Sequence, residues 1–89
     1  MMPNYKVVLF TDSVHQQYMT EQQQAIDNAI STITSELVDY TDSRLAQFST
    51  KQRVPCVMIF KDGARMMSKH SKISHDEMVN WIKGVVGTL

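Results

Sequence analysis

The sequence lacks a second cysteine, and glycine and proline are scarce. Its 89 residues include one cysteine, Cys56, with 3 glycines and 2 prolines. A single cysteine excludes an internal disulfide, a Cys-x-x-Cys redox pair and every multi-cysteine zinc or iron-sulfur site. The low glycine and proline content is typical of a folded chain and argues against low complexity.

Long hydrophobic runs are also missing. The longest apolar run is residues 56–60, whereas a membrane-spanning helix needs about 20 residues. The opening residues 1–5 do not resemble a secretory signal, so we expect a soluble, cytoplasmic protein. A chain of this length predicts one domain over residues 1–89, too small to enclose a large cavity, so any site should be shallow.

Net charge is formally zero, but the two signs are separated along the chain. Residues 1–42 carry six acidic residues and one basic residue, Lys6, whereas residues 43–89 carry eight basic and three acidic residues. This asymmetry bears on partners rather than on fold, and it leaves open self-association through the acidic N-terminal and basic C-terminal halves.

Hydrophobic periodicity predicts alternating strands and helices. Short β-branched or apolar runs predict strands, and apolar residues three and four positions apart predict helices. The predicted order is β-α-β-α-β-β-α, with strands at 5–10, 36–40, 56–60 and 64–69 and helices after Ser13, over 43–50 and from Ser74 to Gly87. The β-α-β unit should be parallel and the 62–63 turn antiparallel, which predicts a mixed four-stranded sheet flanked by three helices on both faces.

Local signals mark some boundaries better than others. Asp62-Gly63 is a two-residue hairpin signal. Ser74 with Glu77 has capping-box spacing and Gly87 is a helix stop. The first helix has two competing capping boxes, at Ser13 with Gln16 and at Thr20 with Gln23, so its start stays open. Its inner stripe is predicted to contain Tyr18, Gln22, Ala25, Ile26, Ala29, Ile30 and Ile33.

This order of elements, together with three local features, resembles a minimal thioredoxin or glutaredoxin fold. Residues 7–11 are similar to the first strand of a glutaredoxin, Val54-Pro55 occupies the place of the family's cis-proline, and residues 59–63 resemble the thioredoxin hairpin. The resemblance implies an α/β thioredoxin-like domain. It also implies that the family's redox motif would lie where the first strand enters the first helix, a place that here reads His15-Gln16-Gln17-Tyr18. Both sulfurs are absent, so dithiol exchange is excluded for the monomer.

The resemblance implies a contact region at this corner, formed by His15, Gln16, Tyr18, Val54, Pro55 and Cys56. In the family the backbone beside the cis-proline pairs with an extended stretch of a client protein, which needs no catalytic side chain. We therefore expect a non-catalytic protein-binding or regulatory module, with an unidentified protein partner and no cofactor.

The alternative is a one-cysteine oxidoreductase or transferase that works through Cys56 and glutathione, with His15 lowering the thiol pKa. Free cysteines are more often buried apolar residues, which favours the binding interpretation. A second alternative is a self-associating structural protein.

Other site types have weaker support. Asp12, Ser13 and His15 are too close in sequence to form a catalytic relay and are interpreted as residues of the helix start. His70, His75 and Asp76 offer too few ligands for zinc, so no metal site is predicted. The basic residues of 51–72 are not interleaved with aromatic residues, which disfavours nucleic-acid binding.

Overall fold

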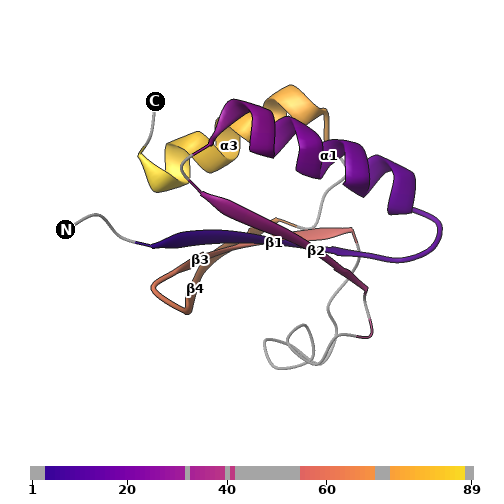
Figure 1. The fold of residues 1–89 in the computed structure, drawn as a ribbon, viewed down its shortest axis with the longest axis horizontal. Helices are drawn as coiled ribbons and strands as arrows, with labels where there is room; N and C mark the ends of the chain where they lie inside the picture. Colours follow the sequence, from indigo (N-terminus) through magenta and orange to yellow (C-terminus); the bar gives the residue numbers. More distant parts are fainter. Residues whose placement is uncertain (1–3, 32, 40, 42–54, 70–72, 88–89) are drawn as a thin grey trace.

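A computed structural model describes residues 4–31, 33–39, 41, 55–69 and 73–87. The chain forms strands and helices in the predicted order (Figure 1): β1 (Tyr5–Thr11), α1 (Gln16–Ala29), β2 (Thr34–Asp39), β3 (Cys56–Lys61), β4 (Ala64–Lys69) and α3 (His75–Val86). The predicted short helix over 43–50 lies outside the described residues.

The strands form one mixed sheet in the order β2-β1-β3-β4. β1 pairs with β2 in parallel, while β1 with β3 and β3 with β4 are antiparallel. The predicted mixed four-stranded sheet is therefore confirmed. Its central strands β1 and β3 carry the continuous apolar runs that suit strands covered on both faces.

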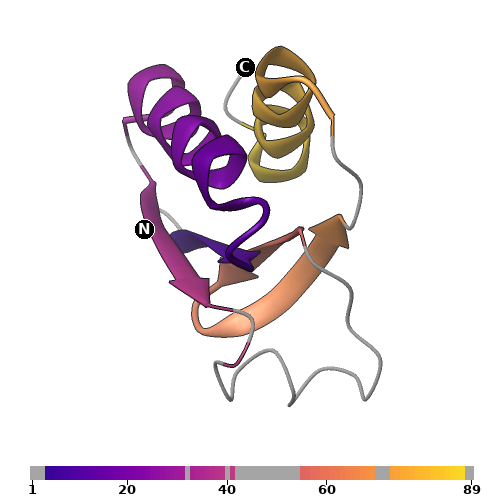
Figure 2. The same ribbon diagram turned by 90° about the vertical axis from the view of Figure 1, so that its right-hand side faces the viewer.

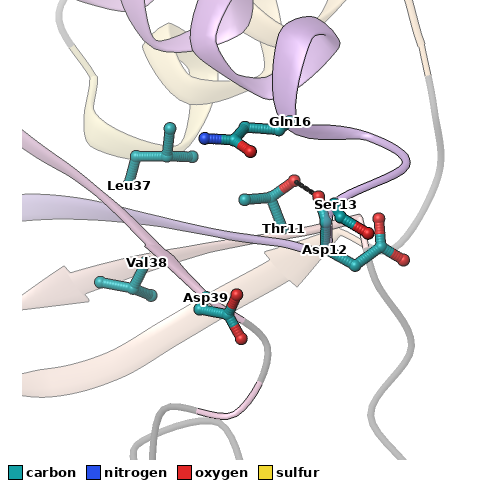
Figure 3. A pocket seen from close by; sticks show the side chains of 7 residues that line it. All are labelled: Thr11, Asp12, Ser13, Gln16, Leu37, Val38 and Asp39. Atoms are coloured by element: carbon teal, nitrogen blue, oxygen red, sulfur yellow. Dashed lines mark hydrogen bonds between the residues drawn. The ribbon is translucent and has the colours of Figure 1, made fainter.

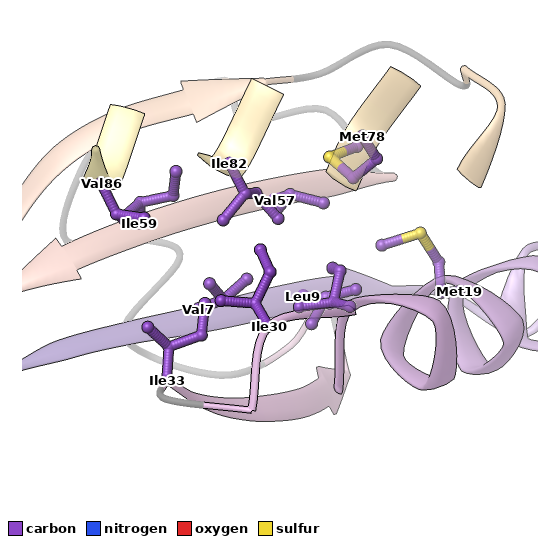
Figure 4. Close-up of a cluster of buried hydrophobic side chains, with 11 residues drawn as sticks. Val7, Leu9, Met19, Ile30, Ile33, Val57, Ile59, Met78, Ile82 and Val86 are labelled. Carbon is purple, nitrogen blue, oxygen red and sulfur yellow. The ribbon is translucent and has the colours of Figure 1, made fainter. Parts of the chain in front are cut away.

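Both described helices cover the same face of the sheet (Figure 2). The main core lies between them and the alternate residues of the central strands (Figure 4), and includes Val7, Leu9, Met19, Ile26, Ile30, Val57, Ile59, Met78 and Ile82. Successive strand residues point to opposite faces, so the intervening residues form a second buried cluster on the other face, with Val8, Phe10, Cys56 and Met58. Helices on both faces were predicted, and neither described helix lies on this second face.

The hairpin and the ends of α3 follow the predicted local chemistry. Asp62 and Gly63 both have positive φ, 52° and 87°, the conformation of a type I′ turn. The Ser74 side chain accepts a hydrogen bond from the Glu77 N–H at 3.1 Å, and Gly87 ends the helix in the left-handed region at φ 75°.

The start of α1 differs from both predictions. The residue before the helix is His15, whose side chain makes no capping bond, and the helix begins at Gln16 rather than at Ser13 or Thr20. The Asp12 side chain instead binds the His15 N–H, so the chain turns before the helix begins. Apolar periodicity continues past the helix end at Ala29, because Ile30 and Ile33 are buried although neither is helical. Among the described residues, neither helix has the length and apolar character required to cross a bilayer.

Candidate functional site

Strand register brings several of the predicted contact residues to one end of the sheet. Phe10 pairs with Cys56, so the end of β1 lies beside the start of β3, and Pro55 immediately precedes that strand. On the other side Thr11 pairs with Asp39, the last residue of β2. The corner between β1 and α1 therefore adjoins both neighbouring strands. Val54 lies outside the described residues.

A carboxylate and an imidazole shape this corner. Asp12 Oδ1 accepts hydrogen bonds from the His15 backbone N–H at 2.9 Å and from His15 Nδ1 at 2.8 Å. Both bonds lower the pKa of Asp12 below its usual value, and the bond from the His15 ring has the larger effect. When Nδ1 carries the proton, the neutral ring has its lone pair on Nε2. The arrangement orders the turn into α1 and offers one polar ring nitrogen beyond it.

A shallow pocket of about 190 Å³ lies between this turn and the end of β2 (Figure 3). Its lining includes two carboxylates, and the Thr11 hydroxyl is turned back to donate to the Asp12 carbonyl at 3.0 Å. The lining residues are Thr11, Asp12, Ser13, Gln16, Leu37, Val38 and Asp39. The β2 residues were missed by the sequence analysis, although the parallel β-α-β unit was a signal that could have found them, because parallel strands end at the same edge.

Val14 is the most exposed large apolar residue at this corner. Its side chain is 83% exposed, on the turn immediately before His15. Val14 was not among the predicted contact residues, because the capping box at Ser13 placed it in the first turn of the predicted helix. No local pattern marked it as exposed.

Tyr18 contacts the start of α3. Its hydroxyl donates to the Ile73 carbonyl and accepts from the Ile73 N–H at 3.0 Å, and its ring stacks on His75 with centroids 5.5 Å apart. Burial raises the Tyr18 pKa. Tyr18 therefore joins the two helices, although the resemblance gave it the position of a redox cysteine.

A second group of polar contacts also joins α1 to the start of α3. His75 Nδ1 donates to Gln22 Oε1, and His75 Nε2 lies 3.7 Å from a Glu21 carboxylate oxygen. Gln22 is fully buried, as its place on the predicted inner stripe required, and its Nε2 has no hydrogen-bond partner among the described residues. These side chains are engaged with one another across the helix interface.

Cys56 lies in the buried cluster of the second sheet face. Its exposed fraction is 0%, beside Val8, Phe10 and Met58. Burial raises the thiol pKa to about 11, and the positive charge of Arg65 offsets the effect only in part. The predicted influence of His15 on this thiol is not among the causes of the shift. The thiol is protonated at neutral pH, and the thiolate is the nucleophilic form.

Metal ligands do not cluster in the described ranges. No three histidine, cysteine, aspartate or glutamate side chains in that part of the chain come together in a way that could hold a metal ion. His75 is engaged with Gln22 and Glu21, and His70 lies outside the described residues.

Known proteins resemble this chain in fold rather than in sequence. No family model matches the sequence, and no curated protein matches it. Solved structures do match. A mutant thioredoxin from Halobacterium salinarum has a TM-score of 0.77 at 13% identity over 97% of this chain and 78% of that one. The chain has the thioredoxin-like fold.

Two further thioredoxins support the same conclusion. Thioredoxin-2 of the malaria parasite, described as a component of the protein secretion machinery, has a TM-score of 0.71 at 15% identity, covering 94% of this chain and 85% of that one. Thioredoxin O2 from Arabidopsis thaliana in the oxidized state also has a TM-score of 0.71 at 15% identity, covering 93% and 76%. This thioredoxin-like chain carries His15 and Tyr18 at the places where the sequence resemblance put the redox cysteines.

Proposed function

We propose that this thioredoxin-like chain is a non-catalytic protein-binding or regulatory module, and that its contact region is the corner between β1 and α1 together with Val54-Pro55. The observation that carries the proposal is the state of its only thiol. Cys56 is fully buried and its pKa is raised to about 11, so a thiolate is scarce at neutral pH.

Surface chemistry at the corner supports binding. The exposed Val14 supplies an apolar contact, the half-buried Pro55 lies before β3, and the pocket beside Asp12 and Asp39 supplies polar groups. Apolar contacts beside a few oriented polar groups are typical of recognition surfaces. An extended partner segment could be held there by its backbone, with no catalytic side chain taking part.

The one-cysteine enzyme is the less well supported candidate. A glutathione-linked reaction through Cys56 would require the thiol to reach a solvent-borne disulfide, and the buried cluster with Phe10 and Met58 prevents this in the folded state. Any such reaction would have to wait for local unfolding.

Site-specific photo-crosslinking tests the contact region. A photoreactive phenylalanine analogue is introduced in place of Val14 in one variant and in place of Asn80, an exposed residue of α3, in a matched control. In extract of the native cell, we expect the Val14 variant to form a discrete crosslinked species that the Asn80 variant lacks. Excess unmodified protein should reduce this species by competition. Equal crosslinking from both positions, without competition, would contradict the proposed contact region.

A further inference from the structure

Two strands form the edges of the sheet. In the described part of the chain, β2 pairs only with β1 and β4 pairs only with β3, so each presents one backbone edge (Figure 2). Each edge strand has six residues, and neither contains proline. Edge strands without proline are able to add a further strand.

The two edges run in the same direction. β2 is parallel to β1, β3 is antiparallel to β1, and β4 is antiparallel to β3. A second copy placed beside the first, with its helices on the same side, therefore brings its β2 against β4 of the first copy in a parallel pair. Sheet twist would turn each added copy relative to the last.

Side chains on β2 present an apolar and an acidic group to this junction. Leu37 pairs with Leu9 and Asp39 pairs with Thr11. Leu9 belongs to the core beneath the helices, so Leu37 and Asp39 lie on the helix-bearing face, two residues apart. Asp39 is exposed, and its Oδ1 accepts from the Thr41 N–H and hydroxyl, which leaves the carboxylate with capacity for further donors.

Side chains on β4 present an apolar and a basic group at the same spacing. Met67 pairs with Ile59 and Lys69 pairs with Val57, both core residues beneath the helices. Met67 is 46% exposed, a high value for a large apolar residue, and Lys69 Nζ lies 5.4 Å from the Trp81 ring centroid. The strand irregularity opposite Ile59 and Phe60 lies before this segment, so residues 67–69 form the regular end of β4.

These two patterns match in one parallel register. We propose that β4 of one copy pairs with β2 of a second copy, with Met67 beside Leu37 and Lys69 beside Asp39. The occupant of each edge is another copy of this chain. The pairing does not rest on the binding function proposed for the corner, although Leu37 and Asp39 also line the pocket there.

The charge distribution selects this pairing over the others. Two copies joined through β2 would place two acidic strands side by side, and two joined through β4 would place two basic strands side by side. Pairing β4 with β2 brings opposite charges together. Glu36, also on β2, already pairs with Lys6 of its own chain at 2.7 Å. Each copy would use both edges, so the contact is head-to-tail and does not close. Assembly should grow with concentration and weaken with salt.

Charge reversal at the junction provides the test. Sedimentation velocity is measured over a concentration series at about 0.01 M salt, where the Debye length is about 30 Å, and at about 1 M, where it is about 3 Å. We expect the weight-average mass to rise with concentration at low salt and to return to the monomer at high salt. Lys69→Glu and Asp39→Lys should each remain monomeric at low salt. Circular dichroism establishes that both variants are folded.

Mixing the two variants tests the register. The β4 edge that carries Lys69→Glu then faces the β2 edge that carries Asp39→Lys, and the native Asp39 faces the native Lys69. An equimolar mixture should therefore recover the wild-type rise in mass. Lys83→Glu and Asp76→Lys on α3 change the net charge by the same amounts but leave both edges native, so they provide the control variants. Each of them alone should associate as wild type does.

Three results would overturn the proposal. One is a wild-type protein that stays monomeric at low salt across the concentration series. Another is association that survives Asp39→Lys, which would indicate pairing through β4 alone. The third is loss of association in Lys83→Glu and Asp76→Lys as well, which would show that net charge rather than the edge register governs association.

Discussion

Cys56 and Tyr18 show how the surroundings of one side chain decide its chemistry. Cys56 begins β3 on the buried second face of the sheet, and its thiol is held protonated by burial. Tyr18 takes the place expected for a sulfur and uses its hydroxyl to join α1 to the start of α3. In the first case burial suppresses reactivity, and in the second a polar group stabilises the helix interface.

Alkaline pH should destabilise the fold through Cys56. In the unfolded chain the thiol ionises near 9, while in the folded chain it keeps its proton until about 11. Above pH 9 the folded state therefore binds more protons, and the free energy of unfolding falls as pH rises, by about 1 to 2 kcal/mol. Urea denaturation at pH 8 and pH 10.5 measures this change.

Cys56→Ala is the matched variant for this measurement. It removes the titrating group but leaves Tyr18, whose raised pKa acts in the same direction in both proteins. The loss of stability between the two pH values should be smaller in Cys56→Ala than in wild type. Equal losses would show that the folded and unfolded thiols ionise alike, contrary to the burial of Cys56.

Tyr18→Phe should destabilise the molecule by about 1 to 2 kcal/mol, because the Ile73 N–H and carbonyl both lose their partner in a partly buried place. Thermal unfolding followed through the single tryptophan, Trp81, reports the change. Tyr5→Phe removes the hydroxyl of a tyrosine on β1 and should lower the free energy of unfolding by less. If the two variants unfold at the same temperature, the Tyr18 hydroxyl does not join the helices.

At the scale of elements, the capping of α3 and the turn before α1 provide a direct contrast. Ser74→Ala should destabilise the protein by about 1 kcal/mol, because the Glu77 N–H loses its acceptor. Ser13→Ala should be nearly neutral, since Ser13 does not cap α1. Urea denaturation of the two variants measures the difference. Equal losses of stability in the two variants would contradict this expectation, because they would indicate that the Ser13 side chain caps α1.

Sequence predicted best the elements whose signals are local and unopposed. The strand over 64–69, the Asp62-Gly63 turn and the Ser74 cap each depend on chemistry within a few residues. The start of α1 was missed because Ser13 and Thr20 offered equal capping patterns. The helix begins at neither place, because the Asp12 side chain binds the His15 N–H and the chain turns before Gln16. The β2 side of the pocket, the exposure of Val14 and the contacts of Tyr18 depend on tertiary neighbours that no local pattern contains.

For the whole molecule, the fold keeps apart the two signs of charge that the sequence separates. The predominantly acidic first half contributes β2 to one edge of the sheet, and the predominantly basic second half contributes β4 to the other. The corner between β1 and α1 lies at the end of the sheet where β3 begins, as in the resemblance that suggested the fold. Binding at the corner and pairing at the edges would share Leu37 and Asp39, at the end of β2.

The proposed function predicts that the chain does not catalyse disulfide reduction. The most direct test is the steady-state reduction of insulin disulfides in the presence of a small dithiol, for wild type and Cys56→Ala side by side. We predict that both match the rate of the dithiol alone. Turnover by wild type well above that rate, abolished in Cys56→Ala, would contradict the account.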